Sequence, residues 1–211
     1  TLPALHERLK AALPAVTADY EIIYVDDGST DCSPEILRGL YEQDRQHVRV
    51  IEFRRNFGKT AALSAGFNQA RGEIIATLDA DLQDDPAELP RLIAELENGY
   101  DMVVGWRKER QDSAGKLRSS LFFNRVVSRL TGNPFNDLNS GFKVYRREVI
   151  KTIRLYSDLH RYIPILATWY GFRVAECPVT HHPRRGGESK YGYGRIARGI
   201  IDLLMVLFLT R

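Results

Sequence analysis

Short apolar runs alternate along the chain with longer segments in which apolar residues recur at helical spacing. Four runs have the length of strands, are rich in Val and Ile and are mostly followed by polar residues or Gly: residues 21–25, 48–53, 73–78 and 101–105. Segments of helical length lie between them, at residues 33–44, 60–70 and 86–97. Strand–helix–strand alternation with short loops predicts an α/β fold, with a Rossmann-like, mostly parallel sheet flanked by helices.

The remaining segments follow a less regular pattern. The chain opens with an amphipathic helix, although a sheet of this kind usually begins with a strand, so we expect a further strand before it. The Ser33-Pro34 and Asp85-Pro86 pairs are start signals for the helices that follow them. The other predicted elements are helices at 2–13, 116–130, 158–170 and 194–209, strands at 142–145 and 172–179, and a basic, Gly-rich loop at 181–193.

Charge divides the chain into two unlike halves. Residues 1–100 contain 18 acidic and 10 basic side chains, whereas residues 101–211 contain 9 acidic and 20 basic ones, and the net charge of +3 hides this division. Such a division indicates a cation site that faces an anion site, or a basic face towards nucleic acid or a membrane. Cys32 and Cys177 have no metal-type spacing, which favours a reduced, cytosolic compartment.

The strongest local signal follows the third predicted strand. Asp79 and Asp81 stand one residue apart, so in an extended chain both side chains can converge on one cation, and Gln83 adds a neutral oxygen. Oxygen ligands of this kind suit Mg²⁺ or Mn²⁺ bound together with substrate phosphate. The alternative is a helix cap, which suits Asp84 and Asp85 better than Asp79. A calcium loop is excluded because Asp84 stands where that loop requires Gly.

Two other strand ends carry polar side chains. Asp26 and Asp27 precede an Asp-Gly turn, and the pattern is evenly balanced between a simple turn and a site that binds a base or ribose. Lys59 belongs to a basic turn at a helix start, which suits phosphate or is a solvated loop. A P-loop is excluded because Phe53 stands where its first Gly is required, and no G-x-G-x-x-G supports a dinucleotide oxidoreductase.

The basic half contains three weaker signals. Arg118, Arg125 and Arg129 fall on one stripe of a predicted helix, although a solvated face explains most charges there. Residues 136–142 form a polar turn before a strand, and residues 181–191 combine flexibility with cations, as expected of a lid over a diphosphate.

Taken in order, five segments resemble the family-2 glycosyltransferases of the GT-A fold. Within that family they resemble the polyprenyl-phosphate branch, which includes dolichyl-phosphate mannosyltransferases and bactoprenol glucosyltransferases. The matching segments are VDDGSTD (25–31), RNFGKTAAL (55–63), LDADLQDDP (78–86), NDLNSGFKVYRR (136–147) and RRGGESKYG (184–192). The resemblance implies an inverting, metal-dependent hexosyltransferase that moves a sugar from a nucleotide-diphosphate sugar, UDP-glucose-like or GDP-mannose-like, to polyprenyl phosphate.

The resemblance also implies a role for individual residues. Asp137 and Asp81 are the candidate catalytic residues, with Asp137 acting either as a carboxylate near the sugar or as a group that orients an Arg or Lys. The metal ligands would be Asp79, Asp81 and Gln83, with Mg²⁺ or Mn²⁺ as cofactor. The nucleotide sugar would contact Asp26, Asp27, Lys59, Asp79 and Arg184. The acceptor phosphate would contact Arg118, Arg125, Ser189 and Lys190.

Family members begin with a strand, and many bacterial members have two transmembrane helices after the amphipathic helix. We therefore expect a catalytic domain at 1–193 without its first strand, and a juxtamembrane amphipathic helix at 194–211 without the membrane region. The expected location is the cytoplasmic face of a membrane, and self-association is left open.

Two rival functions remain. One is the same fold acting on a soluble saccharide or protein acceptor, and the other is a non-catalytic membrane-docking domain, which would not need Asp79, Asp81 and Gln83 together. Nucleic acid is not an expected partner, because no aromatic stacking platform accompanies the basic residues.

Overall fold

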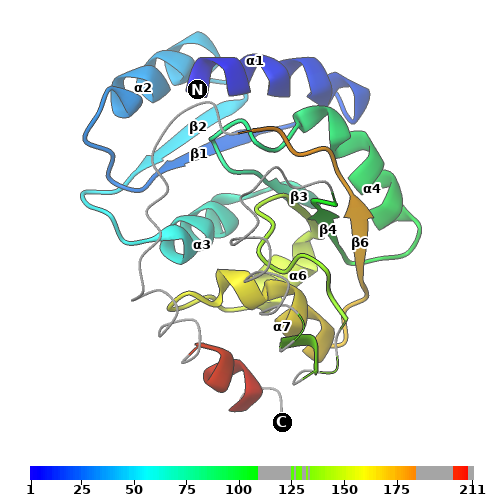
Figure 1. Ribbon diagram of the computed structural model, residues 1–211. Coiled ribbons are helices and arrows are strands. Elements are labelled where there is room, and N and C mark those ends of the chain that lie inside the picture. The colour runs from blue at the N-terminus through cyan, green and yellow to red at the C-terminus, as the bar shows by residue number, and fades with distance from the viewer. Residues whose placement is uncertain (109–124, 126, 130–131, 133, 184–201, 209–211) are drawn as a thin grey trace.

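The computed structural model describes residues 1–108, 125, 127–129, 132, 134–183 and 202–208. Six strands in these residues form two separate sheets (Figure 1). The first sheet pairs β1 (Ile22–Asp26) with β2 (Val48–Glu52) in parallel. The second has the order β3-β5-β4-β6, with β3 (Ile74–Thr77), β4 (Met102–Trp106), β5 (Lys143–Arg146) and β6 (Val174–Pro178). All six predicted strands are present, within a residue or two at each end.

One strand runs against the others in the larger sheet. β4 and β6 pair in parallel, whereas β5 is antiparallel to both β3 and β4. β3 and β4 therefore point the same way, and their carboxyl ends lie at one edge of the sheet. Ligands of open α/β sheets bind at this edge, which places the residues after β3 and β4 where a site is expected.

Helices cover the sheets as the sequence predicts. The described helices are α1 (Leu2–Ala12), α2 (Ser33–Gln43), α3 (Lys59–Gln69), α4 (Leu89–Glu97), α6 (Arg147–Thr152) and α7 (Ile163–Trp169), with short 3₁₀ turns η1 (Leu13–Ala15), η2 (Pro86–Glu88) and η3 (Leu159–Tyr162). Asp85 caps η2 by accepting a hydrogen bond from the amide of Ala87. Ser33 is the first residue of α2 instead of its cap, and Asp31 accepts its amide hydrogen bond. The short helix α6 was not predicted.

Both faces of the larger sheet are buried. Met102 and Val104 of β4 pack into one hydrophobic cluster together with α7, whereas Val103 between them packs into another together with α4. Alternate residues of a strand point to opposite faces, so a strand covered on both sides must be apolar throughout. This explains the continuous apolar run at residues 102–104 and gives a layered α/β arrangement that confirms the predicted fold class.

A cavity of about 1060 Å³ lies between the two sheets. It is lined by β1, β3, the apolar side of α1 and residues of α3. β1 and β3 each have a hydrogen-bonded neighbour on one side only among the described strands. The expectation of a further strand before residue 1 stays a prediction.

The end of the chain is described only at residues 202–208, which are helical (Figure 1). Leu203 and Val206 are buried in the core, whereas Leu204 and Phe208 are 61% and 86% exposed. Both the buried and the exposed side of this helix therefore have apolar side chains, and the amphipathic helix expected at 194–211 stays a prediction. Most of the predicted basic helix at 116–130 and of the loop at 181–193 lies outside the described residues. None of the described helices has the length and apolar character that a bilayer crossing requires.

Candidate active site

The acidic segment after β3 begins at the sheet edge and turns sharply. Asp79 follows β3 by two residues, and Asp81 accepts a hydrogen bond from the amide of Gln83 (3.1 Å). Leu82 between them has φ 64°, a left-handed conformation that is rare for a residue with a side chain. Its side chain is 4% exposed and packs in the core with Leu89 and Leu92. Hydrophobic burial therefore holds this strained turn, a feature that often accompanies functional sites.

The position of the Asp79 carboxylate depends on Lys59, which pairs with it, and on Gly141, which leaves room for it. The ammonium of Lys59, the first residue of α3, lies 2.5 Å from Oδ1 of Asp79. Burial opposes ionisation of Asp79, but Lys59, with help from Lys143 and Arg107, lowers the pKa of this carboxyl below its usual value. A Cβ on Gly141 would lie 2.6 Å from Oδ2 of Asp79, so only glycine leaves room for the carboxylate. This explains the Gly of the Ser-Gly-Phe segment.

Asp26 and Asp27 form the turn that brings Lys59 to the site. Asp26 accepts hydrogen bonds from the amide and hydroxyl of Ser29. Asp27 reaches across to the neighbouring loop, where its two oxygens accept the amides of Phe57 (2.7 Å) and Gly58 (2.8 Å). A simple turn thus accounts for the contacts of both aspartates, and their contact with a nucleotide stays a prediction.

Asp137 lies deep in the site and faces an arginine. The guanidinium of Arg107, just after β4, donates from Nε to Oδ2 (2.7 Å) and from Nη2 to Oδ1 (2.9 Å) of Asp137. Burial disfavours the charge on Arg107, but Asp137 outweighs it and raises the pKa of Arg107. Glu176 of β6 accepts the amides of Asn136 and Asp137, which fixes the backbone of this turn.

Lys143 and His160 belong to the same site and were missed from sequence. Burial, followed by the fields of Lys59 and Arg107, lowers the pKa of Lys143 to about 7. Burial, followed by Lys59, Arg161 and Lys143, lowers the pKa of His160 to about 3. Nδ1 of His160 lies 2.8 Å from the hydroxyl of Thr60. A lysine inside an apolar strand was the available signal for Lys143, and Arg107 directly after a strand was the signal for the arginine; His160 had none.

Gln83 contacts the segment that follows β6. Its side-chain nitrogen lies 3.3 Å from Nε2 of His181 and 3.3 Å from the carbonyl of His182. The ring of His182 lies 3.0 Å from Asp85, and Asp84 is buried against His181. The acidic segment is therefore tied to the start of the predicted lid loop.

The predicted residues are only partly brought together. Asp79, Lys59 and Asp137 surround one region, since the charges of all three act on the pKa of Lys143. Arg125 is helical and exposed. The other predicted phosphate ligands lie outside the described residues: Arg118, Arg184, Ser189 and Lys190.

The carboxylates fit a metal that is shared with a substrate. Among the residues that the structure describes, no three His, Cys, Asp or Glu side chains could hold a metal ion by themselves. Mg²⁺ commonly takes one or two carboxylates from a protein and the remaining oxygens from substrate phosphates and water. Asp79 and Asp81 at the sheet edge fit that arrangement.

Comparisons with known proteins find relatives over nearly the whole chain. The family model described as Glycosyl transferase family 2 matches residues 2–154. Dodecaprenyl-phosphate galacturonate synthase of Rhizobium johnstonii is 41% identical over 211 residues, which cover 98% of this chain and 62% of the relative. Undecaprenyl-phosphate 4-deoxy-4-formamido-L-arabinose transferase of Photorhabdus laumondii is 40% identical over 207 residues, which cover 98% of this chain and 64% of the relative. The chain therefore spans less than two thirds of the length of these relatives.

Solved structures with similar folds are more distant in sequence. Glucosyl-3-phosphoglycerate synthase from Mycobacterium tuberculosis, in complex with Mn²⁺ and UDP-glucose, matches with a TM-score of 0.73 at 19% identity, covering 98% of this chain and 74% of that one. Mannosyltransferase PcManGT from Pyrobaculum calidifontis, in complex with GDP-mannose and Mn²⁺, matches with a TM-score of 0.64 at 19% identity, covering 99% and 60%. At these identities the likeness concerns the fold alone.

Proposed function

The chain belongs to glycosyl transferase family 2, and on that premise we propose that it transfers a sugar from a nucleotide-diphosphate sugar to polyprenyl phosphate. Two observations support the acceptor class. Relatives at 41% and 40% identity carry names that specify a polyprenyl-phosphate acceptor, whereas the structure named for a phosphoglycerate product is only 19% identical. The sugars named for the two relatives differ, so neither name fixes the donor.

The observation that carries the proposal is the gathering of opposite charges at the sheet edge. Asp79 with Lys59, and Asp137 with Arg107, form two ion pairs that lie within each other's fields. This arrangement offers carboxylates for a divalent cation and fixed cations for the anionic oxygens of a diphosphate. Preorganised charges of this kind stabilise a leaving group most effectively where water is excluded.

The reaction follows from these charges. An oxygen of the acceptor phosphate attacks the anomeric carbon of the donor sugar, and the bond from that carbon to the diphosphate breaks on the opposite face, so the configuration inverts. The electron pair leaves with the nucleoside diphosphate. The acceptor oxygen is already ionised near neutral pH, so no residue has to remove a proton from it.

The residues of the chain position the reactants. Asp79 and Asp81 would hold Mg²⁺ or Mn²⁺ against the donor diphosphate, and a bound ion would supply charge neutralisation for the leaving group. Lys59 keeps Asp79 ionised, and Asp137 holds the Arg107 guanidinium in a fixed direction. Arg184, Ser189 and Lys190 would add cationic and hydroxyl contacts to phosphate, as the family resemblance implies.

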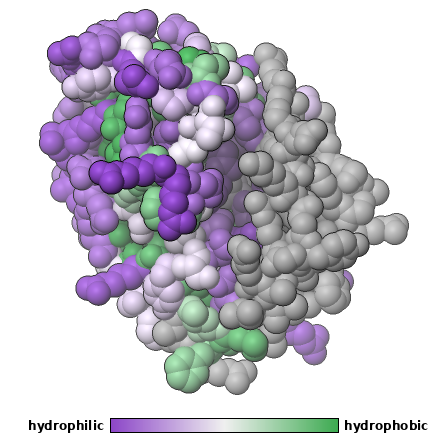
Figure 2. All heavy atoms as spheres, turned by 90° about the vertical axis from the view of Figure 1, so that its left-hand side faces the viewer, coloured by the Kyte–Doolittle hydropathy of each residue, from purple (hydrophilic) through white to green (hydrophobic). Residues whose placement is uncertain are grey.

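A membrane location is part of this proposal, because the acceptor is a lipid. Figure 2 shows apolar residues at the lower end of the molecule, where helix 202–208 lies in Figure 1. Leu204 and Phe208 are the exposed apolar side chains of that helix. An amphipathic segment at the membrane surface would bring the lipid phosphate to the site from the cytoplasmic face.

Product formation in vesicles tests the proposal. The chain is incubated with vesicles that contain undecaprenyl phosphate, with Mn²⁺ or Mg²⁺ and with UDP- and GDP-sugars in turn, and lipid-linked sugar is detected by mass spectrometry. We expect product from at least one donor, its loss in Asp81→Asn, and its retention in Asp19→Asn, a change at an exposed residue before β1. Transfer only to soluble saccharides would favour the rival acceptor class, and no transfer to any acceptor would contradict the proposal.

A further inference from the structure

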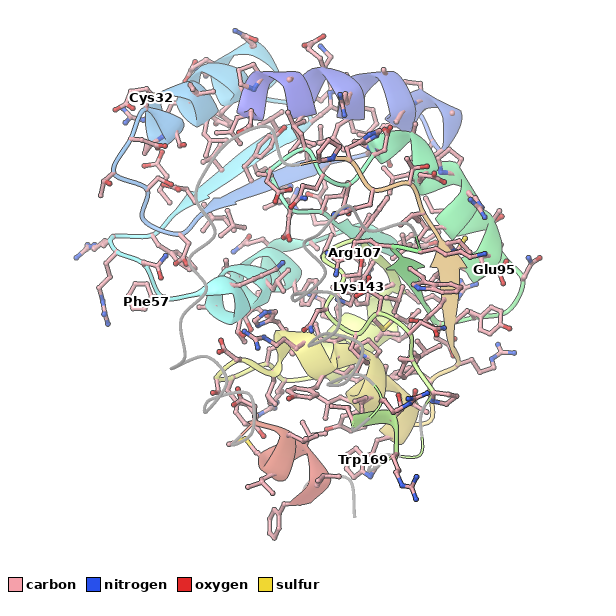
Figure 3. The ribbon with its side chains drawn as sticks, in the orientation of Figure 1. Cys32, Phe57, Glu95, Arg107, Lys143 and Trp169 are labelled. Carbon is pink, nitrogen blue, oxygen red and sulfur yellow. The ribbon has the colours of Figure 1, made fainter. Side chains whose placement is uncertain are left out.

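Lys143 occupies an unusual position for a lysine. It lies in β5, the strand flanked by β3 and β4, where it stands opposite Thr77 on one side and Val104 on the other. Only 4% of it is exposed, and Figure 3 shows it beside Arg107 in the middle of the molecule. Burying an ammonium without a counter-ion is unfavourable, which is why burial lowers the pKa of Lys143 to about 7, and a bound anion would favour its charged form.

No carboxylate of the described residues supplies such a counter-ion. Asp79 is paired with Lys59 and Asp137 with Arg107, whereas the Lys143 ammonium donates only to the backbone carbonyl of Ser140. Arg161, whose charge acts on the same region, also makes no ion pair with a described residue. Among the described residues, the site therefore has two basic side chains, Lys143 and Arg161, that make no ion pair with a carboxylate.

Lys143 lines a small cavity. Its volume is about 10 Å³, room for about one water. The polar side chains that line it are Lys59, Asn139, Ser140, Lys143, His160 and Arg161, with Thr77 and Tyr145. The lining includes three cations and no carboxylate. We call this space the Lys143 pocket.

The Lys143 pocket adjoins Asp79. Lys59 and Gly141 both line the pocket; the Lys59 ammonium is paired with Asp79, and a Cβ on Gly141 would lie 2.6 Å from Oδ2 of Asp79. A sugar held next to Asp79 would therefore present one of its substituents to the pocket. One carboxylate oxygen fits the volume of a single water, whereas the three terminal oxygens of a phosphate need more room.

We propose that the Lys143 pocket binds a carboxylate on the donor sugar, so that the donor class is a nucleotide-diphosphate uronate. This inference rests on the proposed function. One carboxylate oxygen fills the pocket and accepts from Lys143, and the other faces Lys59 or Arg161. The substrate thereby supplies a counter-ion that the described residues do not provide.

Donor binding without acceptor tests this inference separately from sugar transfer. Calorimetry compares matched pairs in the presence of Mg²⁺: UDP-galacturonate with UDP-galactose, UDP-glucuronate with UDP-glucose, and GDP-mannuronate with GDP-mannose, with UDP and GDP alone as reference. A buried charge-assisted hydrogen bond is worth roughly 10- to 100-fold in affinity. We expect at least one uronate to bind about tenfold or more tightly than its neutral counterpart.

Lys143→Met removes the charge with little change in volume, so the fold should persist, and the thermal midpoint checks this. The uronate preference should disappear in this variant and persist in Lys10→Met, a change at an exposed residue of α1. The inference is wrong if no uronate binds more tightly than its neutral partner. It is equally wrong if Lys143→Met weakens the bare nucleoside diphosphate as much as the uronate, because the ligand would then be phosphate.

Discussion

The guanidinium of Arg107 donates hydrogen bonds to both carboxylate oxygens of Asp137, and only 15% of the arginine side chain and 3% of the aspartate side chain are exposed. The sequence left two roles open for Asp137, a carboxylate near the sugar and a group that orients a cation. Since both of its oxygens accept hydrogen bonds from one guanidinium, we infer that Asp137 positions Arg107. The pair also ties β4 to the turn before β5, two segments that are distant in sequence.

Asp137→Asn should lower the free energy of unfolding by about 3 kcal/mol, because it leaves the buried Arg107 charge without a counter-ion. Urea denaturation measures this. The matched control is Glu42→Gln, which breaks the exposed ion pair with Arg45 and should leave the free energy of unfolding nearly unchanged. Equal effects of the two changes would show that the buried ion pair contributes no more to the free energy of unfolding than the exposed one.

Gly141→Ala should disturb the site while preserving the fold. The added Cβ would lie 2.6 Å from Oδ2 and 2.7 Å from Cγ of Asp79, so the carboxylate must move. We expect a loss of transferase activity of about tenfold or more with little change in thermal midpoint.

Gly39→Ala provides the control for that change. A Cβ at Gly39 in α2 would meet nothing within 4 Å, and alanine favours a helix over glycine by roughly 1 kcal/mol. This variant should be fully active and slightly more stable. Full activity of Gly141→Ala would mean that the position of Asp79 does not matter for catalysis.

His160 should make stability fall in weak acid. Burial holds its pKa at about 3 in the folded chain, below the ordinary value of 6.5. Between these values the unfolded chain binds more protons, so the stabilising contribution is present above pH 6.5 and is lost progressively as pH falls. The free energy of unfolding is measured by denaturant titration at pH 6 and at pH 5. Between these pH values it should fall by about 1 kcal/mol more in the wild type than in His160→Gln.

Thr60→Val separates burial of the His160 ring from its hydrogen bond. This variant removes the hydroxyl that lies against Nδ1 but leaves the ring buried, so the pH dependence should remain. The same pH dependence in wild type and His160→Gln would assign the effect to another group.

Exposed apolar residues of helix 202–208 should mediate contact with lipid. Replacing Leu204 and Phe208 together with Ser removes exposed apolar surface, and vesicle co-sedimentation should weaken by about tenfold. Tyr41→Ser in α2, at the opposite end of the molecule in Figure 1, should leave it unchanged. Equal binding by all three proteins would remove this helix from the membrane contact.

Local patterns predicted the elements, and their limits explain what was missed. Apolar runs located the strands because a strand buried on both faces must be apolar along its own length. Proline start signals and helical spacing located most helices, because the residues that begin a helix are neighbours in sequence. Other contacts join residues that are 30 or 31 positions apart. Asp27 accepts the amides of Phe57 and Gly58, and Asp137 pairs with Arg107. His160 reaches the site across 100 residues, so no local pattern could identify it.

The left-handed turn at Leu82 links the acidic segment of the site to the hydrophobic core. Its backbone conformation persists because the leucine side chain is buried with Leu89 and Leu92, so the direction of Asp81 depends on the packing of apolar residues. Truncation of Leu89 or Leu92 in α4 should therefore release the turn before the molecule unfolds. Inactivating substitutions in a random library should then occur among these aliphatic positions, in proteins that are still folded.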